Sequence, residues 1–531
     1  MDQEKILFVL REPEDHLAEA VAYLRALALP TGMTAEIVNG GETNVAHYGN
    51  KAETASEAKY KVYLAPGSVI LQKDLLVRTI ETFRKCPDIG ILGVLGTEQL
   101  PTSGFFQNAA HKIGRALAAD GKSILGEPVE GEAQVVQSLS GGLLITQYDI
   151  PWREDLFLGD VFLAASLCAE MRRAGHQAAV LRTEEDALLL AREPETGTRE
   201  EQDAFLDEYS TELFPLVSVI IPTYQRPAYF RQALASVVAQ TYRNLDIFIT
   251  DNSHNTETKK VYEKYFARDQ RIHYEWHPDW GAAENWGCAR AYNNPEARYV
   301  NWLMDDDLFM PEKIATMMNY FFAYPDLMLV TSYRRLIDAE GRFLQDLPQT
   351  EPFVSQTARI PGEDAGRQIL RQRINFIGEP TTALAKKSGM LGGYQLGWTG
   401  REGKYGISDF PTWLRLLTQG DMVYIREPLS CFRLHAGQDQ GQISTILAGA
   451  ICWGMMLQAA LAQQVFLSSE ADRREALLGW LASTTRNFQE ALIMPALWQE
   501  TALQDLLKVY AGIANALAQG GQIHFDIDTG V

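Results

Sequence analysis

The sequence predicts an α/β protein with two domains of the same class, followed by an all-α segment. Short apolar runs alternate with amphipathic helical stretches in two separate parts of the chain, which is the pattern of a layered fold with a largely parallel sheet. A segment of the first part also recurs in the second. The last part, from about residue 444 to residue 519, is rich in Ala, Leu and Gln and is typical of helices.

The first α/β pattern starts near the beginning of the chain. The apolar run Ile6–Leu10 predicts a strand, and the helix after it has its apolar residues on one face. Further strands are expected at Lys61–Leu64 and Ile89–Leu95, with a helix between them over about residues 73–86. The apolar face of the first helix consists of Leu17, Val21, Leu24 and Ala28.

The pattern starts again after an acidic, polar stretch at residues 193–215, which predicts a linker with at least one helical turn. The β-branched run Val217–Ile221 suits a buried parallel strand, and it ends at Pro222. The elements expected after it are a helix at Tyr229–Gln240 and strands at Asp246–Thr250 and Tyr299–Leu303.

An internal repeat links the two α/β patterns. Residues 58–74 (AKYKVYLAPGSVILQKD) align without a gap with residues 297–313 (ARYVNWLMDDDLFMPEK). In both copies an aromatic strand leads through a turn into a helix. Chance similarity is the alternative over so short a stretch, but the same order of elements around each copy favours duplication. At the turn, the second copy has Asp305-Asp306-Asp307 where the first has Pro66-Gly67-Ser68.

The length of 531 residues agrees with two to four domains. The boundaries that we expect are a first α/β domain at residues 1–195, a linker at 196–214, a second α/β domain at 215–440 and a helical domain at 441–531. A homo-oligomer formed through the helical domain is one role for that last part.

The charge balance excludes some partners. The formal net charge is −20, and unspecific nucleic-acid binding or a polybasic membrane anchor needs cationic side chains instead. We therefore expect no nucleic-acid partner.

The cysteine pattern and the apolar segments favour the cytoplasm. Five cysteines without CxxC spacing indicate reduced thiols rather than a disulfide scaffold or a zinc site. Ile446–Leu457 is too short an apolar run to span a membrane, so we expect a buried helix there. Peripheral attachment at the inner membrane face is left open.

The three consecutive aspartates at the repeat turn are the most informative motif. Crowded carboxylates raise each other's pKa, and a divalent cation removes that conflict. Oxygen ligands favour Mg²⁺ or Mn²⁺ over zinc. The alternative is a helix cap, because a helix is expected to begin near Pro311 and Asp is a good capping residue.

The motifs in this second part resemble the family 2 glycosyltransferases of the GT-A fold. They are VSVIIPTYQRP, QTYRNLDIFITDNS, the Gly281–Gly287 segment and NWLMDDDLFMPEKI. The resemblance implies two tandem GT-A (nucleotide-diphospho-sugar transferase, Rossmann-like) domains plus the C-terminal all-α segment. It also implies that a sugar nucleotide lies across the carboxyl ends of a parallel sheet.

The resemblance assigns residues to the donor and to a metal ion. Asp251 would hydrogen-bond the nucleobase, although Asp, Asn and Ser at that point also suit an ordinary turn. Glu284 stands where the family commonly has Arg, so a cationic phosphate contact is not expected there. Asp305 or Asp306 would reach the ribose and Asp307 the metal, with Asp305 a second metal candidate. The donor set is completed by Pro222, Thr223, Tyr224, Arg226 and Asn285.

The resemblance also points to a catalytic base and an acceptor region. Asp409 matches the base of inverting members, which must lie within reach of the acceptor hydroxyl; a helix cap before Phe410-Pro411 is the alternative. His435 is a further metal candidate, and a solvated loop histidine is the alternative. Acceptor or phosphate contacts are expected from Glu379, Trp398, Arg433 and Gln438. The glycine-rich loop 395–406 suits either a lid or an ordinary flexible loop.

The N-terminal copy resembles the same fold without the metal motif. Gly159-Asp160 lies where the base motif would be, or Asp160 caps its helix. Because Pro66-Gly67-Ser68 supplies no carboxylate, we expect this domain to be degenerate.

The predicted function is a metal-dependent inverting glycosyltransferase with one active site, in the middle domain. It would use Mn²⁺ or Mg²⁺ and a nucleotide-diphosphate sugar, a UDP-sugar above all, with a glycan or protein acceptor in polysaccharide biosynthesis or protein glycosylation. The alternatives are a two-site glycan polymerase and a non-enzymatic carbohydrate- or protein-binding scaffold.

Overall fold

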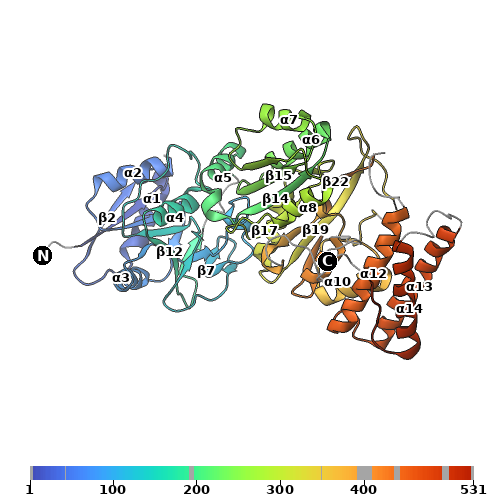
Figure 1. Cartoon of the computed structure of the whole chain (residues 1–531). Helices are drawn as coiled ribbons and strands as arrows, with labels where there is room; N and C mark the ends of the chain where they lie inside the picture. Colours follow the sequence, from blue (N-terminus) through green and yellow to red (C-terminus); the bar gives the residue numbers. More distant parts are fainter. Residues whose placement is uncertain are drawn as a thin grey trace. The chain divides into compact units, whose positions relative to one another are not determined.

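The computed structural model describes residues 4–41, 44–190, 197–347, 350–390, 409–435, 443–492 and 501–527 (Figure 1). The chain divides into two compact units, residues 1–214 and residues 215–531. Each unit is built around an α/β sheet, as the sequence predicts.

The first unit has a mixed sheet whose first three strands in chain order are parallel. Its strand order is β2-β1-β3-β11-β5-β12-β9, and β1 pairs in parallel with both β2 and β3. The same unit contains a smaller sheet with the strand order β10-β6-β7-β13-β4. Its strands are β10 (Ser138–Leu139), β6 (Leu95–Thr97), β7 (Ile113–Ala118), β13 (Leu188–Leu190) and β4 (Val69–Ile70). The strands of the main sheet are β1 (Lys5–Leu10), β2 (Thr34–Asn39), β3 (Tyr60–Leu64), β5 (Ile89–Gly93), β9 (Ala133–Val136), β11 (Leu143–Thr146) and β12 (Gln177–Leu181). The helices are α1 (Glu14–Arg25), α2 (Val45–Ala55), α3 (Leu75–Lys85), α4 (Leu163–Arg173) and α5 (Arg199–Leu213).

The second unit repeats this sheet. Its strand order is β16-β15-β14-β17-β21-β19-β22-β18, with β16, β15, β14 and β17 mutually parallel. The strands are β14 (Val217–Thr223), β15 (Leu245–Asp251), β16 (Ile272–Trp276), β17 (Tyr299–Trp302), β18 (Leu308–Phe309), β19 (Leu329–Ile337), β21 (Leu384–Lys386) and β22 (Met422–Arg433). The helices of this α/β part are α6 (Pro227–Val238), α7 (Glu257–Tyr265), α8 (Ala282–Ala291), α9 (Lys313–Ala323), α10 (Gly362–Gln372) and α11 (Asp409–Leu417).

The two sheets agree with the predicted duplication. The order β2-β1-β3-β11-β5-β12 of the first sheet corresponds to β15-β14-β17-β21-β19-β22 of the second, with the same parallel and antiparallel pairings. In the alignment of the sequence repeat, β3 corresponds to β17 and β4 (Val69–Ile70) corresponds to β18. The helix after that turn, α3 in one unit and α9 in the other, then follows at nearly the same spacing.

Helix α5 differs from the expected linker. It begins with a capping box between Thr198 and Glu201, in which each side chain accepts a hydrogen bond from the other residue's backbone N–H. Its inner face buries Phe205, Tyr209 and Leu213 within the first unit. Residues 199–213 are therefore a packed helix of the first domain, and the polar residues that predicted a linker form its outer face.

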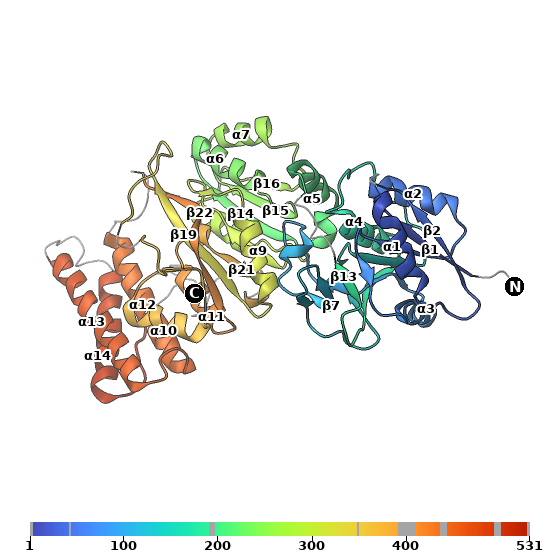
Figure 2. The ribbon, with the colours of Figure 1, turned by 180° about the vertical axis from the view of Figure 1, so that it is seen from behind.

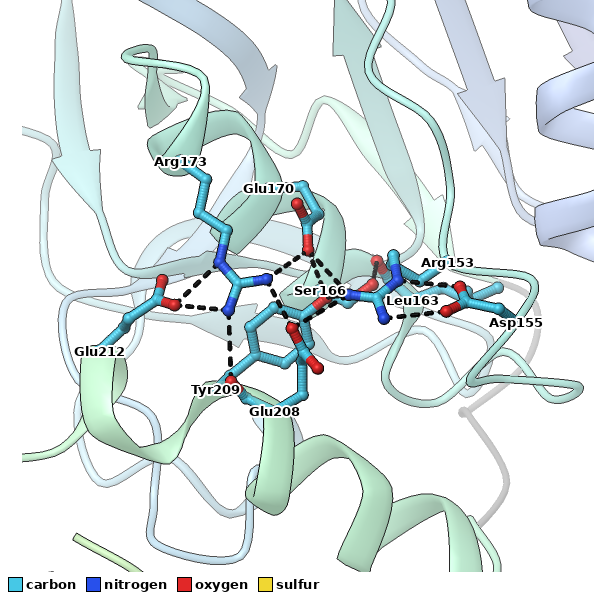
Figure 3. A network of polar contacts seen from close by, with 9 residues as sticks. All are labelled: Arg153, Asp155, Leu163, Ser166, Glu170, Arg173, Glu208, Tyr209 and Glu212. Carbon is cyan, nitrogen blue, oxygen red and sulfur yellow. Dashed lines mark hydrogen bonds and ion pairs between the residues drawn. The ribbon is translucent and has the colours of Figure 1, made fainter.

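A network of ion pairs also joins α5 to α4 (Figure 3). Arg173 on α4 lies between Glu208 (2.7 Å) and Glu212 (2.5 Å) of α5, and it also contacts Glu170 on its own helix at 2.9 Å. The Tyr209 hydroxyl donates to Glu170 at 2.8 Å. Partly exposed ion pairs contribute little individually, so the buried aromatic face is the main stabilising contact and the network fixes the helix orientation.

The C-terminal helices are part of the second unit rather than a separate domain. Helices α12 (Ile443–Gln463), α13 (Glu470–Leu492) and α14 (Thr501–Gln519) lie side by side in both views (Figures 1 and 2). They share one hydrophobic core with α10 and α11, in which Phe410 contacts Trp453 with ring centroids 4.8 Å apart. Trp453 and Trp480 are buried.

The apolar stretch of the chain lies in helix α12. Among the described helices, residues 446–463 alone are long and apolar enough to cross a membrane by length and composition, with a mean hydropathy of 1.5. Of this window, 56% is buried in the structure. Helix α12 contributes residues such as Ile451 and Met456 to the core of the second unit.

The packing of α5 predicts its contribution to stability. Phe205 is wholly buried against Phe157 and Phe162. The substitution Phe205→Ala should therefore lower the free energy of unfolding of the first domain by about 3–5 kcal/mol. Arg199→Ala, at an exposed position of the same helix, should change it by no more than about 0.5 kcal/mol. Hydrogen exchange of the peptide 199–213 in both variants is the measurement. Equal exchange rates would show that α5 does not contribute to the fold of this domain.

Candidate functional site

The three aspartates of the repeat lie in the turn between β17 and β18, at the carboxyl end of the parallel strands. The strand that leads into the turn is almost entirely buried, and so are the aspartates: Asp305 is 6% exposed, Asp306 7% and Asp307 0%. Buried carboxylates need hydrogen-bond donors or a cation, and the neighbouring strands supply the donors.

Asp305 is held by the end of strand β14. The Thr223 hydroxyl donates to it at 2.8 Å and the Tyr224 backbone N–H at 3.3 Å. An Nη of Arg226 donates to its other oxygen at 3.2 Å. Burial first, and then the charge of Asp306, raise the pKa of Asp305 to about 6, although Arg226 and Thr223 act in the opposite direction. Thr223, Tyr224 and Arg226 thus lie beside the aspartates.

Asp306 has two partners at one oxygen. The same Nη of Arg226 lies 2.9 Å from its Oδ2, and the Nε2 atom of His435, which follows β22, also lies 2.9 Å away. The side chain of His435 is 8% exposed and that of Asp306 9%. The structure therefore brings His435 to the aspartate turn, although 129 positions separate the two residues in the chain.

Asp307 is the most deeply buried of the three. The Thr381 hydroxyl donates to its Oδ2 at 2.7 Å, and the backbone N–H of Arg433 donates to its Oδ1 at 3.0 Å. Burial first, and then the charge of Asp306, hold the pKa of Asp307 well above its ordinary value. Both oxygens of the residue predicted to hold the metal are thus occupied by protein donors.

Arg433 differs from the predicted phosphate contact. Its side chain is wholly buried and lies over the ring of Tyr229, 4.7 Å from the ring centroid. Its guanidinium donates to the Asp306 carbonyl at 2.6 Å and to Gln232 at 3.0 Å. This arrangement fixes the backbone of the aspartate turn rather than presenting a charge to a ligand.

On the predicted nucleobase side, Asp251 ends strand β15. It is wholly buried, and it accepts hydrogen bonds from the Ser253 backbone N–H at 2.7 Å and from the Tyr274 hydroxyl at 2.5 Å. The Tyr274 ring stacks on Tyr262, with centroids 4.4 Å apart. The expected contact between Asp251 and a base would therefore add to, or displace, partners that the carboxylate already has.

The neighbouring predicted donor residues divide into a buried and an exposed group. Asn285 on α8 is buried, and it joins the ends of two strands by accepting from the Thr250 hydroxyl at 2.6 Å and donating to the Thr223 carbonyl at 3.4 Å. Pro222 is buried within β14. Tyr224 is 45% exposed, and its ring meets His254 edge-on at 5.6 Å. An exposed aromatic ring here is a surface on which a base could stack.

Asp409 lies at the first residue of α11. It is half-buried, and burial raises its pKa to about 6, with a further increase from the charge of Glu379. Glu379 forms an ion pair with Arg334, and its charge also raises the pKa of Asp307. The charge of Glu379 therefore acts on both Asp307 in the aspartate turn and Asp409. The predicted acceptor residues Trp398 and Gln438, and the loop 395–406, lie outside the described residues.

The side chains at the aspartate turn offer a metal ion few protein ligands. In the part of the chain that the structure describes, no group of three or more His, Cys, Asp or Glu side chains is arranged to hold one. Asp306 and His435 nevertheless form a close pair, and their separation of 2.9 Å is near the spacing of adjacent ligands at about 2.1 Å from an octahedral ion. Two protein ligands are enough for Mg²⁺ or Mn²⁺ when waters and substrate phosphates supply the rest.

Sequence patterns did not identify two residues of the site. Thr381 and Tyr274 donate to the buried aspartates Asp307 and Asp251. Hydroxyl residues of this kind carry no spacing signal, and only the fold brings them next to a carboxylate.

Comparisons with known families agree with the duplicated architecture. Residues 6–209 match a family described as "Glycosyltransferase like family". Residues 218–385 match "Glycosyl transferase family 2".

Several curated proteins are similar to part of the chain. The uncharacterized glycosyltransferase RT0329 of Rickettsia typhi is 36% identical over 234 residues, which are 42% of this chain and 65% of that protein. An uncharacterized glycosyltransferase of Rickettsia bellii is 33% identical over 146 residues, 26% of this chain and 20% of that protein. Protein CgeD of Bacillus subtilis is 31% identical over 136 residues, 24% of this chain and 31% of that protein. The chain thus spans less than two thirds of the length of these relatives.

Solved structures give a weaker likeness. TarS 1-349 of S. aureus in complex with UDP-GlcNAc has a TM-score of 0.37 at 13% identity, covering 60% of this chain and 95% of that one. The mannosyltransferase PcManGT of Pyrobaculum calidifontis, in complex with GDP-Man and Mn²⁺, has a TM-score of 0.31 at 13% identity, covering 58% and 89%.

The contacts of Asp307 predict the effect of removing its hydroxyl partner. Thr381→Val keeps the shape of the side chain but leaves a buried carboxylate oxygen without a donor, so it should lower the free energy of unfolding by about 1–3 kcal/mol. Thr381→Ser retains the hydroxyl and is the matched control. Urea unfolding at pH 7 measures both variants, and equal stabilities would contradict the role assigned to this hydrogen bond.

Proposed function

Because the chain carries two tandem domains of the glycosyltransferase family 2 type, we propose that the second domain is a metal-assisted, inverting glycosyltransferase. It would move a sugar from a nucleotide-diphosphate sugar to a glycan or protein acceptor. One observation carries the proposal: the ends of β14, β17 and β22 bring Arg226, three aspartates and His435 together in the domain that also holds Asp409. This is an anionic site that needs a cation, with a separate carboxylate of raised pKa nearby.

Donor binding is assigned to the rim of this site. Tyr224 offers an exposed ring for the base. Asp305 lies close by and accepts a hydrogen bond from the Thr223 hydroxyl. A base that reaches Asp251 would take over the hydrogen bond now made by Tyr274. A UDP-sugar is the first donor to test.

The metal ligands in this proposal differ from those expected from the motif alone. Asp306 and His435 would hold the ion, because both oxygens of Asp307 are engaged by Thr381 and Arg433. When bound, Mn²⁺ or Mg²⁺ would neutralise the charge that develops on the leaving diphosphate. Arg226 already bridges Asp305 and Asp306, so it keeps the two carboxylates together before the ion arrives.

Asp409 is the base in this mechanism. Its carboxylate would accept the proton of the acceptor hydroxyl as that oxygen attacks the anomeric carbon from the side opposite the diphosphate, which inverts the configuration. A carboxylate with a pKa near 6 is a stronger base than an ordinary aspartate and is still ionised at pH 7. Glu379 contributes to this raised pKa, and as a neighbour of Asp409 it is also the proposed acceptor contact.

A two-site polymerase finds less support. It would need a second metal-assisted donor site, and the turn of the first domain contains Pro66-Gly67-Ser68 in place of the aspartates. A non-enzymatic scaffold would retain the shape of the second domain but would not depend on Asp409.

Asp409 gives a sharp test of the mechanism. Asp409→Asn should lower kcat for sugar transfer by about 10²–10⁴-fold and leave donor affinity within about twofold, because the base acts only in the chemical step. In the unsubstituted protein, kcat/KM should fall about tenfold per pH unit below about pH 6 and level off above it, since only the ionised carboxylate accepts a proton. Asp364→Asn, at an exposed position of α10, is the control. Transfer by Asp409→Asn at the unsubstituted rate would refute the assignment.

The proposed metal pair can be tested by binding alone. Calorimetry with UDP should show tight binding only when Mn²⁺ is present, and His435→Ala or Asp306→Asn should weaken it at least tenfold, which is about 1.4 kcal/mol. His524→Ala, an exposed histidine of the C-terminal part, should bind as the unsubstituted protein does. Mn²⁺-independent UDP binding, or no effect of either substitution, would contradict the pair.

A further inference from the structure

The first unit contains a cavity of about 1060 Å³. Its wall includes Arg11 at the end of β1, Pro66 in the turn after β3, Gly141 before β11 and Asp160 before α4. In the duplicated topology this is the place where the second domain has its aspartate turn and Asp409. Ligand sites of this size are typical at the carboxyl ends of α/β sheets, so the degenerate domain has kept a binding cavity.

The turn of the first domain lacks the three aspartates, and a glutamate from another segment contacts it instead. Because Ile6 pairs with Tyr60 and Val217 pairs with Tyr299, Glu12 falls in the register position of Thr223. Glu12 is 2% exposed, and its carboxylate accepts the backbone N–H of Gly67 at 2.7 Å. The Glu12 carboxylate is therefore used within the protein, and the turn residues themselves have none to offer to a metal ion.

The cationic side chains of the wall are also engaged. Among the described residues that line the cavity they are Arg11 and Lys112. Arg11 forms an ion pair with Asp160 at 2.5 Å, and Lys112 donates to the carbonyls of Gln107 (2.9 Å) and Ala109 (3.3 Å), while burial lowers its pKa. Asp120 and Glu201 add negative charge to the same wall. A diphosphate would thus meet neither a metal site nor an available cation.

Asp160 is paired with a cationic side chain, unlike the base proposed in the second domain. Helix α4 begins at Leu163 without a side-chain cap, so Asp160 does not cap it. Its carboxylate faces Arg11 instead, and its side chain remains 50% exposed. The pair presents acceptor and donor atoms side by side, which suits the adjacent hydroxyl groups of a sugar.

The remaining wall is mostly apolar with a few polar groups. Tyr48, Phe106 and Leu158 supply apolar surface, and Gln107 and Ser140 supply polar atoms. Sugars carry apolar C–H faces as well as hydroxyls, so a wall of this mixed character suits them. The volume exceeds what a single sugar needs.

We propose that this cavity binds an uncharged oligosaccharide without a metal ion, which makes the first domain a carbohydrate-binding domain rather than a second transferase. This inference is independent of the proposed function, because it concerns other residues and a different ligand charge. The absence of carboxylates in the turn agrees with this ligand, because an uncharged oligosaccharide needs no metal ion to bind.

The test uses the full chain and a panel of uncharged tri- and tetrasaccharides of the gluco, N-acetylgluco, manno and galacto series. Calorimetry should find at least one member with a Kd of about 1 mM or tighter, unchanged by EDTA. A side chain at Gly141 enters open space, since its Cβ would meet only Ala164, at 3.8 Å. Gly141→Leu should therefore block the cavity and weaken that binding at least tenfold. Asp160→Asn should weaken it about tenfold by removing the charged acceptor.

A matched glycine variant and UDP binding serve as controls. Gly521→Leu, at another glycine with open space around it, should bind the oligosaccharide normally. UDP with Mn²⁺ should bind once per chain, and Gly141→Leu should leave that binding unchanged. The proposal is overturned if no panel member binds, if Gly141→Leu binds as the unsubstituted protein does, or if a second UDP is lost in that variant. Failure of the transferase proposal would instead appear as the absence of UDP binding in both proteins.

Discussion

Three adjacent carboxylates at the end of a buried strand are the constraint on which the second domain depends. Each has different hydrogen-bond partners: Asp305 the end of β14, Asp306 Arg226 and His435, and Asp307 Thr381 and the backbone of Arg433. These partners come from segments far apart in the chain. The turn is therefore formed only when the whole sheet is in place, and the fold and the candidate site are established together.

Much of this fold follows from local patterns. The β-branched run of β14 and the aspartate turn are visible in the sequence, and the repeat correctly predicts two sheets of one topology. At least one helical turn was expected at α5, but its packing into the first domain was not, because its buried residues Phe205, Tyr209 and Leu213 are sparse among acidic side chains. The roles of Thr381 and Arg433 could not be predicted, because a hydroxyl or a guanidinium shows its partner only after long-range packing. The motif likewise does not reveal that Asp307 is enclosed while Asp306 faces His435.

The two domains share one topology but carry different residues at the ends of their strands. Strand order and register agree, whereas the residues at the strand ends differ: the second domain has Thr223 and three aspartates where the first has Glu12 and Pro66-Gly67-Ser68. In the first domain Glu12 contacts the turn after β3 through the Gly67 N–H, and in the second domain Thr223 and Arg226 contact the turn after β17 through Asp305.

The core shared by α10, α11 and the C-terminal helices has a practical meaning for production of the protein. Trp453 of α12 packs on Phe410, the residue next to Asp409, and Phe466 fills the space beside Gly366 of α10. A chain shortened after the second sheet would expose this apolar surface to water and should aggregate. Helices α12, α13 and α14 thus cover an apolar face of the α/β part, and expression of the second unit should include all three.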